Sequence, residues 1–267
     1  MRLFSANKLE PLAEIPATYG PAEEKRSKVV GLVDAPNDRL VFSGYKADTV
    51  WLADVSDPQD PQVRRLKTGD RPYDGLITPS GRYYVAGLYG TDGMGLLDLW
   101  HPEAGMERIL ADYAPAQDKR PVYKMPHLEG WALAGQYAYM PAVGRDAVLV
   151  YDRRTWAQVA NIEMAGQPVF AMAQPDRRRV WVNFAYPDND RVQLIDTESR
   201  EVAQTLKPGK GVLHMAFTGR GDEAWVSVRD AGKVVVYNTH SLDKIAEIPA
   251  ESPSGIFFTH RADDIGL

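Results

Sequence analysis

A short motif recurs along the chain at nearly regular intervals. It is an apolar, strand-like segment that ends in an acidic or amide residue, at Asp54, Asp98, Asp152, Asp196 and Asn238. The spacings between these residues are 44, 54, 44 and 42 positions. A repeat of this length is typical of folds built from copies of one supersecondary unit. The chain is therefore expected to repeat one small unit, and not to form a single irregular core.

Each repeat contains four short strands separated by turn-rich sequence. A segment of period-two alternation precedes the motif, as at 179–184, another opens the unit, as at 169–175, and a fourth follows the acidic residue, as at 201–207. Helical periodicity is almost absent. Four antiparallel strands in about 42 to 54 residues make the blade of a β-propeller, so the sequence predicts an all-β propeller.

The two ends of the chain read as parts of one blade. Residues 1–16 resemble residues 234–249, which are a third and a fourth strand, while residues 253–267 resemble a first and a second strand. Joining them would form a composite blade, leave no open sheet edge and close a ring of six blades. We therefore expect one propeller domain over residues 1–267 that starts and ends within a blade.

Composition removes several classes of function. The 267 residues include no Cys, which excludes a disulfide framework, a thiolate zinc site, an iron–sulfur cluster and a cysteine nucleophile. The net charge of −5 argues against a nucleic-acid binder. No run of eighteen apolar residues is present, so no membrane span is expected. The N-terminus lacks a signal-peptide pattern, which leaves a cytoplasmic protein or a missing natural start as alternatives.

Functional residues of a propeller usually lie in the loops that precede the innermost strands. In four of six repeats these loops contain a cation, at Lys28, Arg71, Lys124 and Lys210. A basic funnel in an acidic protein would suit an anionic ligand. Lys and Arg make up 31 of the 267 residues, so a short window often contains one by chance. The pattern alone is therefore weak evidence.

Two of the five histidines stand at the start of a first strand. His127 lies in the turn-forming run Pro126–Gly130, which makes it the best candidate for a general acid or base or for an axial iron ligand. His214 also opens a strand, where it either contacts a ligand or only packs. The other three are predicted to be exposed turn residues: His101, His240 and His260.

Two further groups are interpreted as structural. The run Asp188–Asp190 has the composition of a hairpin turn, which we favour over a cation site. Three tryptophans recur at strand positions and are predicted to pack between blades: Trp51, Trp181 and Trp225.

Several longer strings resemble the NirF family of haem d1 biosynthesis proteins. They include residues 27–36, 122–131, 212–215 and 252–258, and the resemblance extends over nearly the whole chain. That family is related to the haem d1 domain of cytochrome cd1 nitrite reductase, an eight-bladed propeller with the tetrapyrrole in its central funnel. The resemblance therefore implies a second possibility for the fold, an N-terminally shortened eight-bladed propeller.

The resemblance also implies roles for individual residues. The run 126–130 is similar to the loop whose histidine lies over haem d1 in the nitrite reductase, which implies His127 as a catalytic group or iron ligand. The second distal histidine of that enzyme falls at Gln174, which argues against nitrite reduction. The implied ligand-binding residues are Lys28, Arg71, Tyr73, Asp74, Lys124, Gln167, Phe170 and His214.

The implied ligand or substrate is haem d1 or a late precursor of it. Such a ring carries several carboxylates, which Lys and Arg can bind, and a flat apolar face that Tyr73, Phe170 and Phe184 would cover. The implied activity is assistance in a side-chain tailoring step, as an oxidoreductase, with the periplasm as the location by resemblance.

Two alternatives remain at this point. One is a tetrapyrrole carrier, or a protein-interaction propeller that binds other haem d1 biosynthesis proteins or cytochrome cd1 nitrite reductase. The other is a lactonase-like metal enzyme. That enzyme would need converging Glu, Asn and Asp side chains, which the loops before the first strands supply only sparsely.

Overall fold

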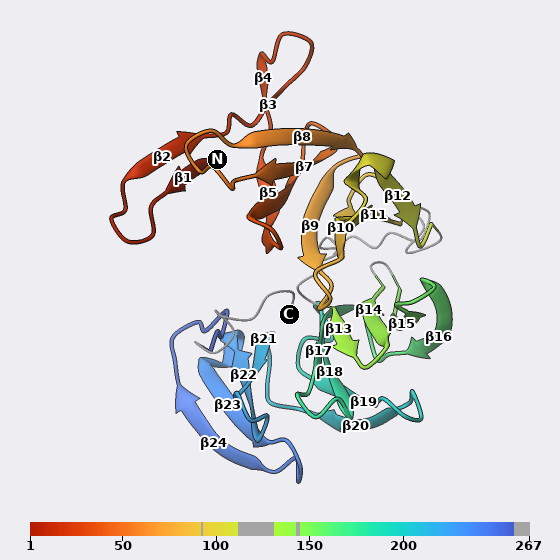
Figure 1. Ribbon diagram of the computed structural model, residues 1–267. Helices are drawn as coiled ribbons and strands as arrows, with labels where there is room; N and C mark the ends of the chain where they lie inside the picture. The colour runs from red at the N-terminus through yellow and green to blue at the C-terminus, as the bar shows by residue number, and fades with distance from the viewer. Residues whose placement is uncertain (92, 112–130, 143–144, 259–267) are drawn as a thin grey trace. The chain divides into compact units, whose positions relative to one another are not determined.

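The computed structural model describes residues 1–91, 93–111, 131–142 and 145–258, and these contain strands, turns and short 3-10 segments but no α-helix (Figure 1). The described residues belong to two compact units, one within residues 1–113 and one within 114–264, and each is described by itself. None of the described segments forms a helix with the length and hydropathy needed to cross a bilayer.

The first unit contains two four-stranded sheets and two small hairpins. The first sheet is β5 (Val29–Ala35), β6 (Arg39–Gly44), β7 (Thr49–Asp54) and β8 (Gln62–Lys67). The second is β9 (Pro72–Ile77), β10 (Tyr83–Leu88), β11 (Met94–Asp98) and β12 (Met106–Ile109), with the 3-10 segment η1 (Pro102–Ala104) before β12. The hairpins are β1 (Arg2–Phe4) with β2 (Pro11–Glu14) and β3 (Thr18–Tyr19) with β4 (Lys25–Arg26).

The second unit contains three four-stranded sheets. The first is β13 (Ala132–Ala134), β14 (Tyr137–Pro141), β15 (Ala147–Asp152) and β16 (Ala157–Glu163). The second is β17 (Pro168–Ala173), β18 (Arg179–Phe184), β19 (Val192–Asp196) and β20 (Val202–Leu206). The third is β21 (Val212–Phe217), β22 (Glu223–Val228), β23 (Lys233–Asn238) and β24 (Lys244–Pro249). The 3-10 segment η4 (Arg229–Ala231) joins β22 to β23. In all five four-stranded sheets, neighbours in the chain are antiparallel neighbours in the sheet, which confirms the predicted repeat.

The recurring acidic or amide residue forms a turn after the third strand of each blade. In each blade it ends the third strand, and its side-chain oxygen accepts a hydrogen bond of 2.9 to 3.0 Å from the backbone N–H two residues later. This Asx-turn geometry starts the turn to the fourth strand. The five residues are Asp54, Asp98, Asp152, Asp196 and Asn238.

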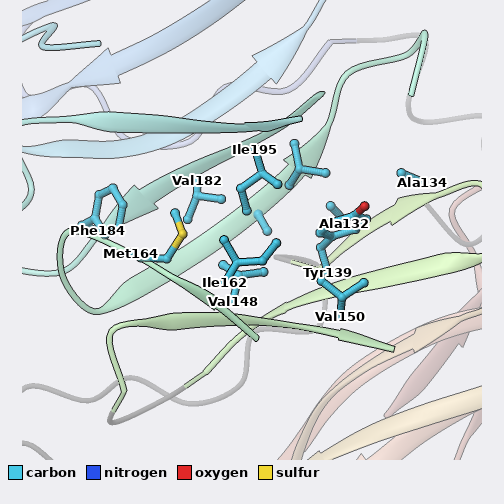
Figure 2. Close-up of a cluster of buried hydrophobic side chains, with 12 residues drawn as sticks. Ala132, Ala134, Tyr139, Val148, Val150, Ile162, Met164, Val182, Phe184 and Ile195 are labelled. Carbon is cyan, nitrogen blue, oxygen red and sulfur yellow. The ribbon is translucent and has the colours of Figure 1, made fainter. Parts of the chain in front are cut away.

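Apolar side chains from adjacent blades form the core of each unit. In the second unit, one cluster joins the sheet β13–β16 to the sheet β17–β20, and Figure 2 shows Val148 and Ile162 among its members, with Phe184. Phe184 is 1% exposed, so the prediction that it covers a ligand ring is wrong. Trp51 and Trp181 are fully buried as predicted, whereas Trp225 is only partly buried and meets Phe258 edge to face at 5.7 Å between ring centroids.

In the first unit, a buried tyrosine in the second strand of one blade contacts the first two strands of the other blade. The hydroxyl of Tyr84 donates to the carbonyl of Gly31 at 3.0 Å and lies 3.2 Å from the hydroxyl of Ser43. Its burial raises the pKa of Tyr84. A Cβ atom on Gly75 would lie 2.1 Å from the Tyr84 oxygen, so this position of β9 must be glycine.

The chain ends agree with the sequence prediction in part. Residues 2–14 form the hairpin β1–β2, as expected for a third and a fourth strand. Residues 251–258 contain no strand, and residues 259–267 lie outside the described part of the chain. The composite blade, the ring of six and the single domain therefore stay predictions.

Candidate functional site

First strands of the blades lose register close to where they begin. Pairing is interrupted between Pro72 and Gly75 in β9, between Pro168 and Ala171 in β17, and beside Val212 in β21. The strand β5 has a similar interruption. A β-bulge bends its strand and redirects side chains, and bulges are frequent beside active sites.

Three predicted site residues occupy one repeated position. In β9, β17 and β21, the residue paired with the fourth position of the second strand is Gly75, Ala171 or Met215. The residues immediately before these are Asp74, Phe170 and His214. Three blades therefore present a side chain at the same place on a bulged strand, which the linear pattern of the sequence did not reveal.

Two buried polar residues stabilise these bulges, and sequence reasoning missed both. The Oδ1 of Asn183 accepts the backbone N–H of Phe170 at 2.9 Å, and the Oγ of Ser227 accepts that of His214 at 2.9 Å. The Nδ2 of Asn183 also donates to the carbonyl of Leu213 in the next blade at 3.1 Å. The signal was a polar residue at the fifth position of a second strand, directly after three apolar residues.

In the first unit, Arg71 lies among three tyrosines, and we call Arg71, Tyr45, Tyr73 and Tyr89 the Arg71 cluster. The guanidinium carbon of Arg71 lies 4.9 Å from the ring centroid of Tyr89. Tyr45 contacts Tyr73 edge to face at 5.8 Å and Tyr89 at 6.3 Å between centroids. Cation–π stacking of this kind holds an arginine in place while its N–H edge stays open to solvent.

The predicted charged residues of the first unit are Lys28, Arg71 and Asp74, and none of them is fully buried. Arg71 is exposed, and its guanidinium has no ion-pair partner within the described part of the chain. Lys28 is also exposed, and its carbonyl accepts the N–H of Tyr45 at 3.0 Å. Asp74 is half-buried and accepts the N–H of Gly75 at 3.0 Å. Sequence reasoning missed Tyr45 and Tyr89 because they belong to turns between second and third strands.

In the second unit, two phenylalanine rings lie beside the predicted histidine, and we call Phe170, His214 and Phe257 the His214 cluster. Phe170 meets the imidazole edge to face at 5.7 Å, and Phe257 lies tilted over it at 5.2 Å. The Nδ1 atom accepts a hydrogen bond of 3.2 Å from the backbone N–H of Ile256. That bond requires an unprotonated Nδ1, so a neutral ring carries its proton on Nε2.

The remaining predicted residues have other environments. Gln167 is buried, and its carbonyl accepts the N–H of Ala185 at 2.9 Å. Lys210 is exposed. Lys124 and His127 lie outside the described residues, and so does His260. His101 and His240 are exposed turn residues, as predicted.

Carboxylates do not gather into a metal centre in the part of the chain that the structure describes. In the acidic turn, the Nε of Arg191 lies 2.6 Å from a carboxylate oxygen of Asp190, and its Nη2 lies 3.5 Å from a carboxylate oxygen of Asp188. Both acids are thus engaged by an arginine in a turn, which fits the structural interpretation.

Known proteins resemble the chain along its whole length. The family model "Cytochrome D1 heme domain" matches residues 1–262. Protein NirF of Pseudomonas aeruginosa is 56% identical over 268 residues, an alignment that spans 100% of this chain and 68% of that protein. Protein NirF of Stutzerimonas stutzeri is 51% identical with the same coverage. Dihydro-heme d1 dehydrogenase of P. aeruginosa is 28% identical over 95% of this chain and 50% of its own length.

Two solved structures also resemble the chain. Dihydro-heme d1 dehydrogenase NirN in complex with DHE superposes with a TM-score of 0.78 at 25% identity, over 95% of this chain and 53% of that one. Hydrazine synthase of Kuenenia stuttgartiensis gives a TM-score of 0.63 at 17% identity, over 86% of this chain and 69% of that one, a likeness of fold alone. With all-β blades and these relatives, the chain belongs to the cytochrome d1 heme domain family and, within it, to the NirF proteins.

Proposed function

We propose that this chain is a haem d1 biosynthesis protein that binds haem d1 or a late tetrapyrrole precursor and assists a side-chain tailoring step. The family assignment supports the role, since a full-length match at 56% identity to Protein NirF is accompanied by the match to the cytochrome d1 heme domain. The observation that carries the binding part is the Arg71 cluster.

The residues of this cluster fit such a ligand. A tetrapyrrole with carboxylate side chains needs a cation that no internal acid neutralises, together with aromatic surface for its ring. Arg71 offers the first, because its guanidinium stacks on Tyr89 without a carboxylate partner among the described residues. By contrast, Arg82 is already engaged, since two of its nitrogens bind the carboxylate of Asp98.

The His214 cluster is a separate candidate contact surface within the second unit. Phe170 and Phe257 offer ring edges and faces beside the imidazole. Because the Nδ1 of His214 already accepts the Ile256 N–H, this nitrogen is not available to ligate iron. We keep His127 as the proposed catalytic group and iron ligand, and Lys124 as a proposed carboxylate contact, on the family resemblance alone. Iron in the bound ring would supply the redox chemistry.

The test is a titration of the purified chain with haem d1, followed by its visible spectrum. We expect a spectral shift on binding, and we expect Arg71→Ala to weaken binding about 10-fold or more, since a charge-assisted contact contributes about 1.5–3 kcal/mol. Arg64→Ala is the matched control, because Arg64 is also exposed in the same unit but belongs to the outer strand β8. The absence of a shift at micromolar haem d1 would refute the proposal.

A second candidate function is docking to other proteins. Trp100 is 61% exposed and is held by the guanidinium of Arg82, 5.0 Å from its ring centroid. Trp and Arg are enriched among the residues that contribute most of the binding energy at interface centres. Other haem d1 biosynthesis proteins or cytochrome cd1 nitrite reductase, in the periplasm, are the proposed partners. Loss of co-purification in Trp100→Ala, with the haem d1 titration unchanged, would favour this role.

A further inference from the structure

The backbone of Arg71 has an uncommon conformation for a side chain of its size. Its φ is +53°, in the left-handed region, where a non-glycine residue is strained by about 1–3 kcal/mol. Arg71 immediately precedes β9. The residue that immediately precedes β21 is Gly211, which has a φ of +85°. At the same position before a first strand, one blade thus has a glycine, which adopts a positive φ without strain. Another blade has an arginine, which is strained in that conformation.

Two hydrogen bonds hold this backbone from different turns. A carboxylate oxygen of Asp48, in the β6–β7 turn, accepts the N–H of Arg71 at 2.8 Å. The N–H of Tyr89, just after β10, donates to the carbonyl of Arg71 at 3.0 Å. The carbonyl of Asp48 also accepts the N–H of Thr68 at 3.2 Å, so the connection between the blades is fixed on both sides of its bend.

The Asp48 carboxylate acts on the backbone of Arg71, not on its guanidinium. No ion pair joins these two residues, although their charges are opposite. The guanidinium instead stacks on Tyr89, and its N–H edge is left for another anion. If Asp48 only neutralised the charge of Arg71, its carboxylate would contact the N–H edge of the guanidinium and not the backbone N–H.

We propose that Asp48 is a positioning residue for the ligand site: its carboxylate holds Arg71 in the left-handed conformation that lays the guanidinium on Tyr89, where it meets a ligand carboxylate. This inference rests on the proposed function. It identifies which feature of the protein prepares the anchor before the ligand arrives, since a preorganised side chain loses less freedom on binding.

A double-mutant cycle tests the proposal with haem d1 as the probe. We expect Asp48→Ala to weaken binding about 3- to 10-fold, Arg71→Ala to weaken it about 10-fold or more, and the double variant to bind no worse than Arg71→Ala. Asp48→Asn keeps an acceptor oxygen at the same place and should restore affinity to within about 2-fold of the wild type. A role confined to folding would not make the Asp48 effect depend on Arg71.

The outcomes separate the two claims. Unchanged binding by Arg71→Ala would remove the anchor and with it the proposed ligand site. Weakened binding by Arg71→Ala, with Asp48→Ala unchanged or with losses that add in the double variant, would overturn the positioning role and leave the site standing. If Asp48→Ala does not fold, Asp48→Ser replaces it in the cycle, because serine is tolerated in turns but is too short to reach the Arg71 N–H.

Discussion

At the scale of single residues, the carboxylates of this chain act mainly on the backbone and on arginines. The residue that ends each third strand accepts a backbone N–H two positions later. Asp152 also has a side-chain partner, since the Nε and Nη2 of Arg154 lie 3.1 and 2.7 Å from its two carboxylate oxygens. These contacts stabilise the ionised form of the acid more than the protonated form.

A dependence of stability on pH follows. The guanidinium of Arg154 lowers the pKa of Asp152 to about 2, whereas the pKa of an aspartate in the unfolded chain is about 3.9. Because the folded pKa is the lower one, the contribution of Asp152 is fully present above about pH 4 and is lost as pH falls to about 2. We expect the urea midpoint of the wild type to fall over this interval more steeply than that of Asp152→Asn.

Other acids with lowered pKa values, among them Asp98 and Asp196, titrate in both proteins. The quantity to measure is therefore the difference between the two midpoints at each pH. A difference that stays constant from pH 5 to pH 2.5 would contradict the assignment.

The tautomer of His214 is a second prediction at this scale. Its Nδ1 accepts the Ile256 N–H, so we expect the neutral ring to be protonated on Nε2. The ring ¹⁵N chemical shifts of His214 measure this directly in labelled protein above pH 8. Ile256→Pro removes the donor and should shift the tautomer equilibrium, with Ile256→Val as the control. A ring found protonated on Nδ1 in the wild type would disprove the contact.

At the scale of elements, strands were predictable and bulges were not. The segments expected at 169–175, 179–184 and 201–207 correspond to the strands β17, β18 and β20, because alternation and turn residues are local signals. A bulge depends on how two strands align, which no single strand encodes. The burial of a strand residue is also hard to predict from sequence. Phe184 was expected to cover a ligand ring, but the structure buries it in the core.

The candidate site was predictable to a similar degree. Arg71, Tyr73 and His214 were recognised because they precede or open a first strand. The partners of Arg71 and Tyr73 are Tyr45 and Tyr89, which come from turns in two different blades, so only the packing of the blades brings them together.

The approach of two first strands gives a prediction at this scale. Gly31 in β5 has a φ of +57°, and a Cβ there would lie 2.7 Å from the Gly75 nitrogen and 2.7 Å from the Tyr73 oxygen. Gly135 has a similar φ of +59° and open space around it. We expect Gly135→Ala to lower the free energy of unfolding by about 1–2 kcal/mol from backbone strain alone, and Gly31→Ala to lower it further. Equal losses in urea denaturation would show that β5 and β9 are not so close.

At the scale of the whole molecule, the site is a local exception to the overall charge. The chain carries a net charge of −5, which repels an anionic tetrapyrrole. Lys28 and Arg71 are exposed cations close to the start of first strands, and they act against that repulsion over a short range. Both interactions are screened by salt, but they have opposite signs.

The salt dependence of haem d1 binding should therefore distinguish the attraction by Arg71 from the repulsion by the rest of the chain. In the wild type, raising NaCl from about 0.05 to 0.5 M should weaken haem d1 binding several-fold, because the Debye length falls to a few ångströms and the exposed Arg71 contact is screened. In Arg71→Ala the charge of Lys28 and the net repulsion both remain, so added salt should weaken binding much less than it does in the wild type. Arg64→Ala, which has the same change in net charge, should follow the wild type. Parallel salt slopes in all three proteins would mean that Arg71 does not contact a ligand carboxylate.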